Sequence, residues 1–172
     1  MNNKYVKKVE SRKDFQDFLR LPWKIYKGNK YWIPPLLSEV RKLLDVTKHP
    51  FWNHARREVF LARKDEVPVG RIAAIIDGYH NNFHQGKTGF FGFFECVNDF
   101  EVAKLLWDKA REWLKLNGMD TMRGPVSPSM NNECAFLLEG FDKPATVMMP
   151  YTQPYYLNLA EKYGFRKAKD LY

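Results

Sequence analysis

The clearest periodic pattern in the sequence lies over residues 98–117 and predicts one long amphipathic helix. Apolar residues recur there at the three- and four-residue spacing of a helix face. Asn98 and Glu101 form a variant of the capping box at its start, and Asn117-Gly118 is typical of a helix end. The predicted buried stripe consists of Val102, Leu106, Ala110, Trp113 and Leu114.

Shorter helical patterns occur on both sides of this helix. Ser11 is a favoured N-cap for a helix that begins there, and Pro22 is expected to bend or end that helix. Gly164 is expected to end the last helix. The predicted short helices cover residues 11–22, 23–31, 36–44, 132–138 and 155–163.

Apolar runs between the helices predict a three-stranded meander over residues 58–63, 68–76 and 89–97. The third strand contains Phe90-Phe91-Gly92-Phe93-Phe94, which is apolar on both faces and is therefore expected at the centre of a sheet covered on both sides. We expect Gly92 to mark a bulge. The polar stretch 77–88 is predicted to be a loop, and weaker strands are expected over residues 5–9, 119–123 and 165–172.

These elements predict one α/β domain over residues 1–172, with a mixed, mostly antiparallel central sheet and helices on both faces. The domain could be the N-terminal part of a longer protein. No apolar run is long enough to cross a membrane, and the first ten residues lack the apolar stretch of a signal peptide. We therefore expect a cytoplasmic protein with no membrane partner, in which Cys96 and Cys134 are free thiols.

Charge is distributed unevenly along the chain. The formal net charge is +8, and the whole positive excess lies in residues 1–64. A basic surface of this kind attracts nucleic acid, anionic lipid or a phosphorylated cofactor, or simply keeps a protein soluble. Because Tyr26, Tyr31 and Trp32 lie among these basic residues, and aromatic rings can stack on bases, nucleic-acid binding is one hypothesis.

The order of elements resembles that of the GNAT (GCN5-related N-acetyltransferase) superfamily. The direct passage from Phe94-Glu95-Cys96-Val97 into the long helix is similar to that fold. So is the late helix–glycine–phenylalanine segment, residues 159–165. Three further segments resemble a subgroup of bacterial GNAT-like proteins: residues 31–35, 89–95 and 123–131. The resemblance covers nearly the whole chain, and it implies that the sheet lacks its last strand or that this strand lies beyond the chain.

The resemblance also implies an acyl-CoA cosubstrate. In this family the pyrophosphate binds backbone N–H groups at the start of the long helix, which implies Cys96, Val97 and Asn98 as the cofactor-binding residues here. This stretch departs from the family pattern, because it has no glycine and no basic residue, and Asp99 and Glu101 place negative charge where the anion would bind. The sequence therefore conflicts with ordinary CoA binding.

The resemblance implies a carboxylate base and a tyrosine acid. Glu95 or Glu133 would take the proton from an amine, although a strand-end carboxylate such as Glu95 can equally be part of a simple ion pair. The position of the family tyrosine is Ala160, so that Tyr156 or Tyr163 would have to replace it. The substrate-binding residues we expect are Ser129, Asn131, Asn132, Tyr151 and Tyr155, the first three of which can alternatively serve as helix caps.

Three functions follow from these patterns. The first is acyl transfer from acyl-CoA to an amine or other small-molecule substrate; whether the chain is an enzyme stays open. The second is a GNAT-like ligand-binding or assembly module without catalysis, which the acidic helix start and the missing tyrosine favour. The third, weaker hypothesis is nucleic-acid binding. A homodimer is left open, and His80 with His84 gives no metal site, since zinc needs three or four protein ligands.

Overall fold

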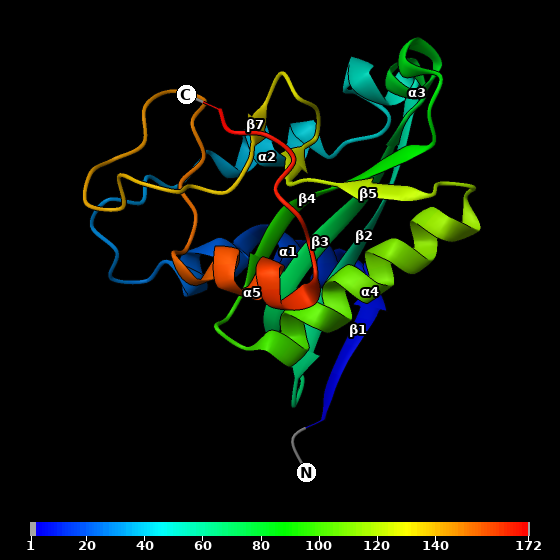
Figure 1. Ribbon diagram of the computed structural model, residues 1–172. Helices are drawn as coiled ribbons and strands as arrows, with labels where there is room; N and C mark the ends of the chain where they lie inside the picture. The colour runs from blue at the N-terminus through cyan, green and yellow to red at the C-terminus, as the bar shows by residue number, and fades with distance from the viewer. Residues whose placement is uncertain (1–2, 172) are drawn as a thin grey trace.

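The computed structural model describes residues 3–171, which form two layers of helices around one twisted sheet (Figure 1). The sheet has the order β1-β2-β3-β4-β5. Its first four strands pair antiparallel, and β5 pairs parallel with β4. The strands are β1 (Lys4–Lys8), β2 (Ala55–Lys64), β3 (Val67–Asp77), β4 (Thr88–Cys96) and β5 (Thr121–Arg123), with a separate two-stranded sheet of β6 (Val126–Ser127) and β7 (Glu133–Cys134). The helices are α1 (Arg12–Ile25), α2 (Leu37–Leu43), the 3-10 helix η1 (Pro50–Asn53), α3 (Gly78–His84), α4 (Phe100–Leu116) and α5 (Tyr155–Tyr163).

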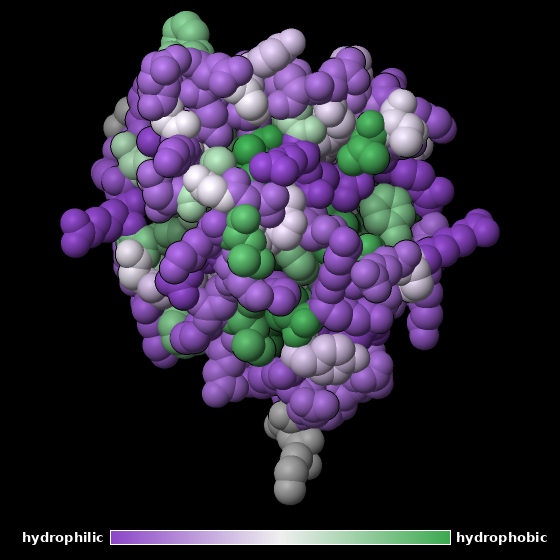
Figure 2. All heavy atoms as spheres, turned by 90° about the vertical axis from the view of Figure 1, so that its right-hand side faces the viewer, coloured by the Kyte–Doolittle hydropathy of each residue, from purple (hydrophilic) through white to green (hydrophobic). Residues whose placement is uncertain are grey.

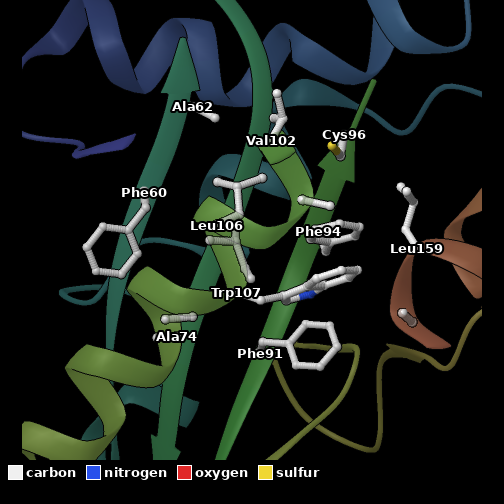
Figure 3. Close-up of a cluster of buried hydrophobic side chains, with 14 of the residues drawn as sticks. Phe60, Ala62, Ala74, Phe91, Phe94, Cys96, Val102, Leu106, Trp107 and Leu159 are labelled. Atoms are coloured by element: carbon white, nitrogen blue, oxygen red, sulfur yellow. The ribbon is translucent and has the colours of Figure 1, made fainter. Parts of the chain in front are cut away.

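Each face of the sheet buries its own apolar core. On one face, α4 and α5 pack against the strands, and Trp107 of α4 stacks on Phe94 of β4 with ring centroids 4.7 Å apart (Figure 3). On the other face, α1 and α2 cover Phe90 and Phe93. The phenylalanine run of β4 supplies both cores, which explains why it is apolar at successive positions and confirms that this strand is covered on both faces. The middle strand of the sheet is β3, and β4 is its neighbour.

Strand β4 bulges at Phe93, and β5 leaves it soon after the two strands begin. The register between β3 and β4 shifts there, and Phe93 has a φ of 49°. Strand β5 pairs only with Thr88, Gly89 and Phe90. The chain then crosses β4 so closely that a Cβ on Gly92 would lie 1.7 Å from the Val126 carbonyl oxygen. The edge of β4 beyond Phe90 is therefore free of strand pairing.

Helix α1 is continuous through Pro22, contrary to the two helices expected over residues 11–31. Proline has no N–H to donate to the carbonyl four residues earlier. The Phe18 carbonyl is thus available, and it accepts a hydrogen bond of 2.9 Å from Nη1 of the buried Arg71. The proline that was expected to interrupt the helix instead provides an acceptor for a buried arginine.

Four further local predictions were wrong. The segment 77–88 contains α3 instead of a loop, because Asp77 caps it through Tyr79 N and His80 N. The N-cap of α4 is Asp99, one residue after Asn98, and its carboxylate accepts from the N–H groups of Glu101 and Val102. Residues 132–138 contain β7 and no helix. Residues 165–171 contain no strand, and Tyr172 lies outside the described residues.

The other predicted elements are present with small changes of their ends. Gly164 ends α5 with a φ of 101°, and Cys96 and Cys134 are both free thiols, as expected. Among residues 3–171 no helix is both long and apolar enough to cross a bilayer. The surface over α4 and β1 is mostly hydrophilic, with hydrophobic side chains scattered over it (Figure 2).

Candidate functional site

A pocket of about 310 Å³ lies where the end of β4 meets two long loops. The loops, residues 26–36 and 138–150, are far apart in sequence but lie side by side at the left of Figure 1. Tyr151 follows the second loop and joins it to the first, since the Asn29 amide donates to its hydroxyl at 3.1 Å. The pocket is lined by Pro22, Trp32, Ile33, Pro34, Pro35, Arg71, Glu95, Glu133, Ala145, Thr146, Val147, Met148, Met149 and Tyr151.

Glu95 is the acid in the wall of this pocket that burial affects most. Its side chain is only 14% exposed. Loss of solvent raises the pKa of its carboxyl from the ordinary value of 4.5 to about 7, although Arg71 and the Tyr156 hydroxyl both favour the charged form. A carboxyl with a pKa near neutrality can exchange a proton with a bound ligand at physiological pH.

Arg71 faces Glu95 from the neighbouring strand, since the two residues are register partners of β3 and β4. Its Nη2 lies 4.0 Å from Glu95 Oε1, and its Nε has no partner among the described residues. The residue is 7% exposed, so this guanidinium is a buried cation with few hydrogen bonds. Glu133 also lines the pocket, is exposed, and adds a second carboxylate.

Two tyrosines of α5 occupy the polar groups along the edge of β4. The Tyr156 hydroxyl donates to Glu95 Oε2 at 2.6 Å and accepts from the Cys96 N–H at 2.9 Å. The Tyr155 hydroxyl donates to the Cys96 carbonyl at 2.7 Å. Farther along the strand, the Phe93 N–H donates to Ser127 Oγ at 2.8 Å.

The start of α4 is closed by an ion pair as well as by its cap. Asp99, which caps the helix, lies 2.7 Å from Nζ of Lys4 on β1, and Glu101 lies 2.5 Å from the same nitrogen. Burial acts to raise the pKa of Asp99, but Lys4 and the N–H groups of Val102 and Glu101 outweigh it, so that this pKa is lowered. Val97 and Asn98 lie at this junction, and two of the first N–H groups of the helix, those of Glu101 and Val102, are bound to Asp99.

The candidate site residues predicted from the sequence lie in different parts of the structure. Glu95, Glu133 and Tyr151 line the pocket, while Tyr155 and Tyr156 lie behind it against β4. Tyr163 is elsewhere, donating to Asp108 of α4 at 2.8 Å. Trp113, which was predicted on the buried stripe of α4, is partly buried and packs against the apolar core beneath this helix.

Ser129 and Asn131 line a second hollow of about 270 Å³ with His80 and His84 of α3. Asn132 accepts from Ser129 Oγ at 2.8 Å. Within residues 3–171, no three His, Cys, Asp or Glu side chains gather closely enough to hold a metal ion. These polar residues therefore do not share the pocket that contains Glu95.

Arg71 was not identified as a site residue from the sequence, and Tyr26 and Trp32 were candidates only for base stacking. Trp32 lines the pocket, and the buried Tyr26 stacks on it with ring centroids 4.8 Å apart. Arg71 did give a signal, because it is the only charged residue within the apolar stretch 67–76. A charge in a buried strand needs a partner, and that partner proved to be Glu95.

This arrangement, with a bulged β4 that β5 leaves after three pairs, is the GNAT acyltransferase fold. A tandem GNAT protein from the clavulanic acid biosynthesis pathway superposes on 94% of this chain and 43% of its own, with a TM-score of 0.59 and 14% identity. The aminoglycoside N-acetyltransferase AAC(6')-Iy in complex with CoA superposes on 100% of this chain and 93% of its own, with a TM-score of 0.58 and 11% identity. FeeM, an N-acyl amino acid synthase from uncultured soil microbes, covers 71% of this chain and 70% of its own, with a TM-score of 0.50 and 15% identity.

Two curated proteins are similar in sequence. Protein YghO of Escherichia coli strain K12 is 35% identical over 96% of this chain and 42% of its own length. The bacterial ceramide synthase of Caulobacter vibrioides strain NA1000 / CB15N is 33% identical over 95% of this chain and 43% of its own length. The chain thus spans less than half the length of both relatives. No protein-family model matches it.

The region that the resemblance implies for acyl-CoA is partly occupied by this chain's own side chains. The N–H groups of Glu101 and Val102 at the start of α4 bind Asp99, whose carboxylate would repel a pyrophosphate placed there. The β4 groups of Phe93 and Cys96 are bound to Ser127, Tyr155 and Tyr156. Solved structures that share this fold contain CoA or acetyl-CoA.

Proposed function

We propose that this chain binds the acceptor amine of an N-acyl transfer reaction, with Glu95 as the general base. The observation that carries the proposal is the buried Glu95 carboxyl, with a pKa raised to about 7, in the wall of the pocket beside β4. An amine that enters this pocket meets two carboxylates, Glu95 and Glu133, whereas its carbon chain meets Trp32 and Met148. Carboxylates attract an ammonium group and apolar side chains attract a carbon chain.

Glu95 would take the proton from the amine nitrogen as that nitrogen forms a bond to the acyl carbon. The leaving group of the acyl donor would depart with the electron pair of the bond that breaks. Tyr156 holds one oxygen of Glu95 in place, at 2.6 Å. The pKa of the Tyr156 hydroxyl is raised well above its usual value, mainly by burial, so this hydroxyl keeps its proton and orients the base.

The names of two similar proteins support an amine acceptor. A ceramide is a long-chain amino alcohol acylated on nitrogen, and the relative that is 33% identical over most of this chain is called a ceramide synthase. The N-acyl amino acid synthase FeeM shares the fold. Both names describe amide formation, so an amine with a carbon chain or ring is the acceptor class we propose.

A second candidate function is a GNAT-like ligand-binding or assembly module without catalysis. The observation that favours it is the closed acyl-CoA region, where Asp99 and Lys4 block the helix start and two tyrosines occupy β4. In that case the pocket would bind the amine without transferring an acyl group to it. Both functions predict amine binding, and they differ in whether an amide forms.

Calorimetry and mass spectrometry test the two functions. Wild type, Glu95→Gln and the exposed control Glu139→Gln are titrated with sphinganine, a long-chain amino alcohol, and with tyrosine. They are then incubated with S-palmitoyl-N-acetylcysteamine, an acyl thioester that lacks the pyrophosphate of CoA. We expect one amine to bind, with about tenfold weaker binding by Glu95→Gln only, and amide formation that this variant loses. Binding without any amide would favour the module, and failure of both amines to bind would contradict the proposed acceptor pocket.

A further inference from the structure

The two loops that line the pocket carry apolar side chains that point into solvent. Val147 is 92% exposed and Leu36 is 70% exposed. Large apolar side chains usually occur singly on a protein surface, and a group of them indicates an interaction site. This apolar rim comprises Ile33, Leu36, Val147, Met148 and Met149, four of which line the same pocket.

The apolar rim is held in place by contacts at its base. The Gln153 amide donates to the Ile25 carbonyl at 3.2 Å, and the Tyr26 hydroxyl donates to the Tyr151 carbonyl at 3.2 Å. Pro34 and Pro35 restrict the backbone of the first loop. The exposed apolar side chains therefore lie on loops that are already ordered, which lowers the entropic cost of binding to a surface.

Basic residues occur in and next to the loops that carry the apolar rim. Lys24 at the end of α1 and Lys27 and Lys30 of the first loop are exposed, and none of them forms an ion pair within the described part of the chain. Lys143 lies on the second loop, together with the acids Glu139 and Asp142. With Glu133 counted, four lysines stand against three acids, and Arg71 balances Glu95 in the pocket wall. The region therefore has a net charge of +1, which complements an anionic surface.

We propose that the apolar rim and its lysines dock on the surface of an anionic lipid bilayer. Apolar side chains that enter the headgroup region and lysines that face lipid phosphates are the combination that binds proteins to such membranes. Docking of this kind needs no spanning helix. The pocket opens between the same two loops, so its mouth would face the lipid, and this inference holds whether or not Glu95 acts as a base.

Vesicle flotation tests the docking surface independently of any acyl transfer. The probes are vesicles of phosphatidylcholine alone and with roughly 30% phosphatidylglycerol. The apolar variant is Val147→Ser/Met148→Ser, and the charge variant is Lys27→Glu/Lys30→Glu. Phe83→Ser and Leu116→Ser are matched controls, because these side chains are 83% and 79% exposed but lie on α3 and α4, away from the loops.

We expect the wild type to float only with the anionic vesicles, and each loop variant to lose about tenfold in partition coefficient. Both controls should float like the wild type. The inference is overturned if the wild type binds neither vesicle, or if the loop variants bind as well as the controls. It is also overturned if light scattering shows a dimer that the apolar variant dissociates, because a second copy would then cover the rim.

Discussion

At the residue scale, the central feature is a pair of oppositely charged residues on two adjacent, buried strands. Arg71 and Glu95 are register partners of β3 and β4, yet their charged atoms stay 4.0 Å apart. Arg71 binds the carbonyl that Pro22 leaves without a donor, and Glu95 binds the Tyr156 hydroxyl. Because burial outweighs the opposing effects of the Arg71 charge and the Tyr156 hydrogen bond, the pKa of Glu95 stays raised and its carboxyl can act on a ligand in the pocket.

The raised pKa of Glu95 predicts that stability falls as pH rises. Between its ordinary pKa of 4.5 and about 7, the folded state keeps a proton that the unfolded chain has lost, so the free energy of unfolding decreases over that range and stays lower above it. Relative to Glu95→Gln, which cannot ionise, the wild type should lose about 2–3 kcal/mol between pH 5 and pH 8. Urea unfolding at a series of pH values measures this difference.

Glu139→Gln serves as the control for the unfolding experiment, because Glu139 is an exposed carboxylate on the second loop. Its curve of unfolding free energy against pH should run parallel to that of the wild type. If the curve of Glu95→Gln also ran parallel to it, the raised pKa of Glu95, and with it the base that we propose, would be contradicted.

The sequence identified Glu95 but not its partner, and the reason is physical. Glu95 could be predicted because it ends a strand that leads into a helix, a local pattern. Arg71 lies 24 positions away in the chain, and its role depends on the register between two strands and on a carbonyl of α1. Pairings of that kind depend on tertiary packing, which the periodicity of one segment does not contain.

At the scale of elements, the helices and strands with a strong local sequence pattern were predicted correctly, whereas those that depend on tertiary packing were not. The meander, α4 and α5 have strong periodicity and clear ends, and they were found. The helix α3 was missed because Asp77 was not considered as an N-cap, although its carboxylate accepts from two backbone N–H groups. The backbone path of the proline-rich stretch 124–154 depends on its packing against other segments, for example against Gly92 of β4. This path could therefore not be predicted from the residues of the stretch alone.

The start of α4 predicts that the wild type does not bind CoA as its structural relatives do. Asp99 and Lys4 hold this helix end closed, so CoA at about 1 mM should leave the melting temperature unchanged in a thermal unfolding assay. Asp99→Ala should lower the free energy of unfolding by about 1 kcal/mol, with or without CoA.

Ser11→Ala is the matched control for this helix start, because Ser11 caps α1 in the same way, through Asp14 N. It should cost a similar free energy and be equally insensitive to CoA. A rise of several degrees in the melting temperature of the wild type with CoA would show that the closed helix start opens for the ligand. Our proposal that this chain binds the acceptor amine but not CoA would then be wrong.

At the scale of the whole molecule, the positive charge of the first third is partly used within the fold. Lys4, Lys7 and Lys8 of β1 pair with Asp99, Asp14 and Glu58, and Arg63 pairs with Asp14 and Asp17. The net charge of +8 is therefore a property of the composition. It does not correspond to an uninterrupted basic face, because acidic residues pair with several of the basic ones. The unpaired lysines near the pocket stand beside apolar side chains, an arrangement that suits a lipid surface better than a polynucleotide.

This distribution predicts weak binding to single-stranded DNA. The aromatic rings that were candidates for base stacking are engaged, since Tyr26 stacks on Trp32 and Lys30 lies over Tyr31, 4.7 Å from its ring centroid. Fluorescence anisotropy with a labelled oligonucleotide at about 150 mM salt should show no saturation below roughly 10 µM protein. Tight binding that weakens steeply with salt, and that Lys27→Glu/Lys30→Glu abolishes, would instead assign the exposed lysines to nucleic acid, because counterion release from phosphates has that dependence on salt.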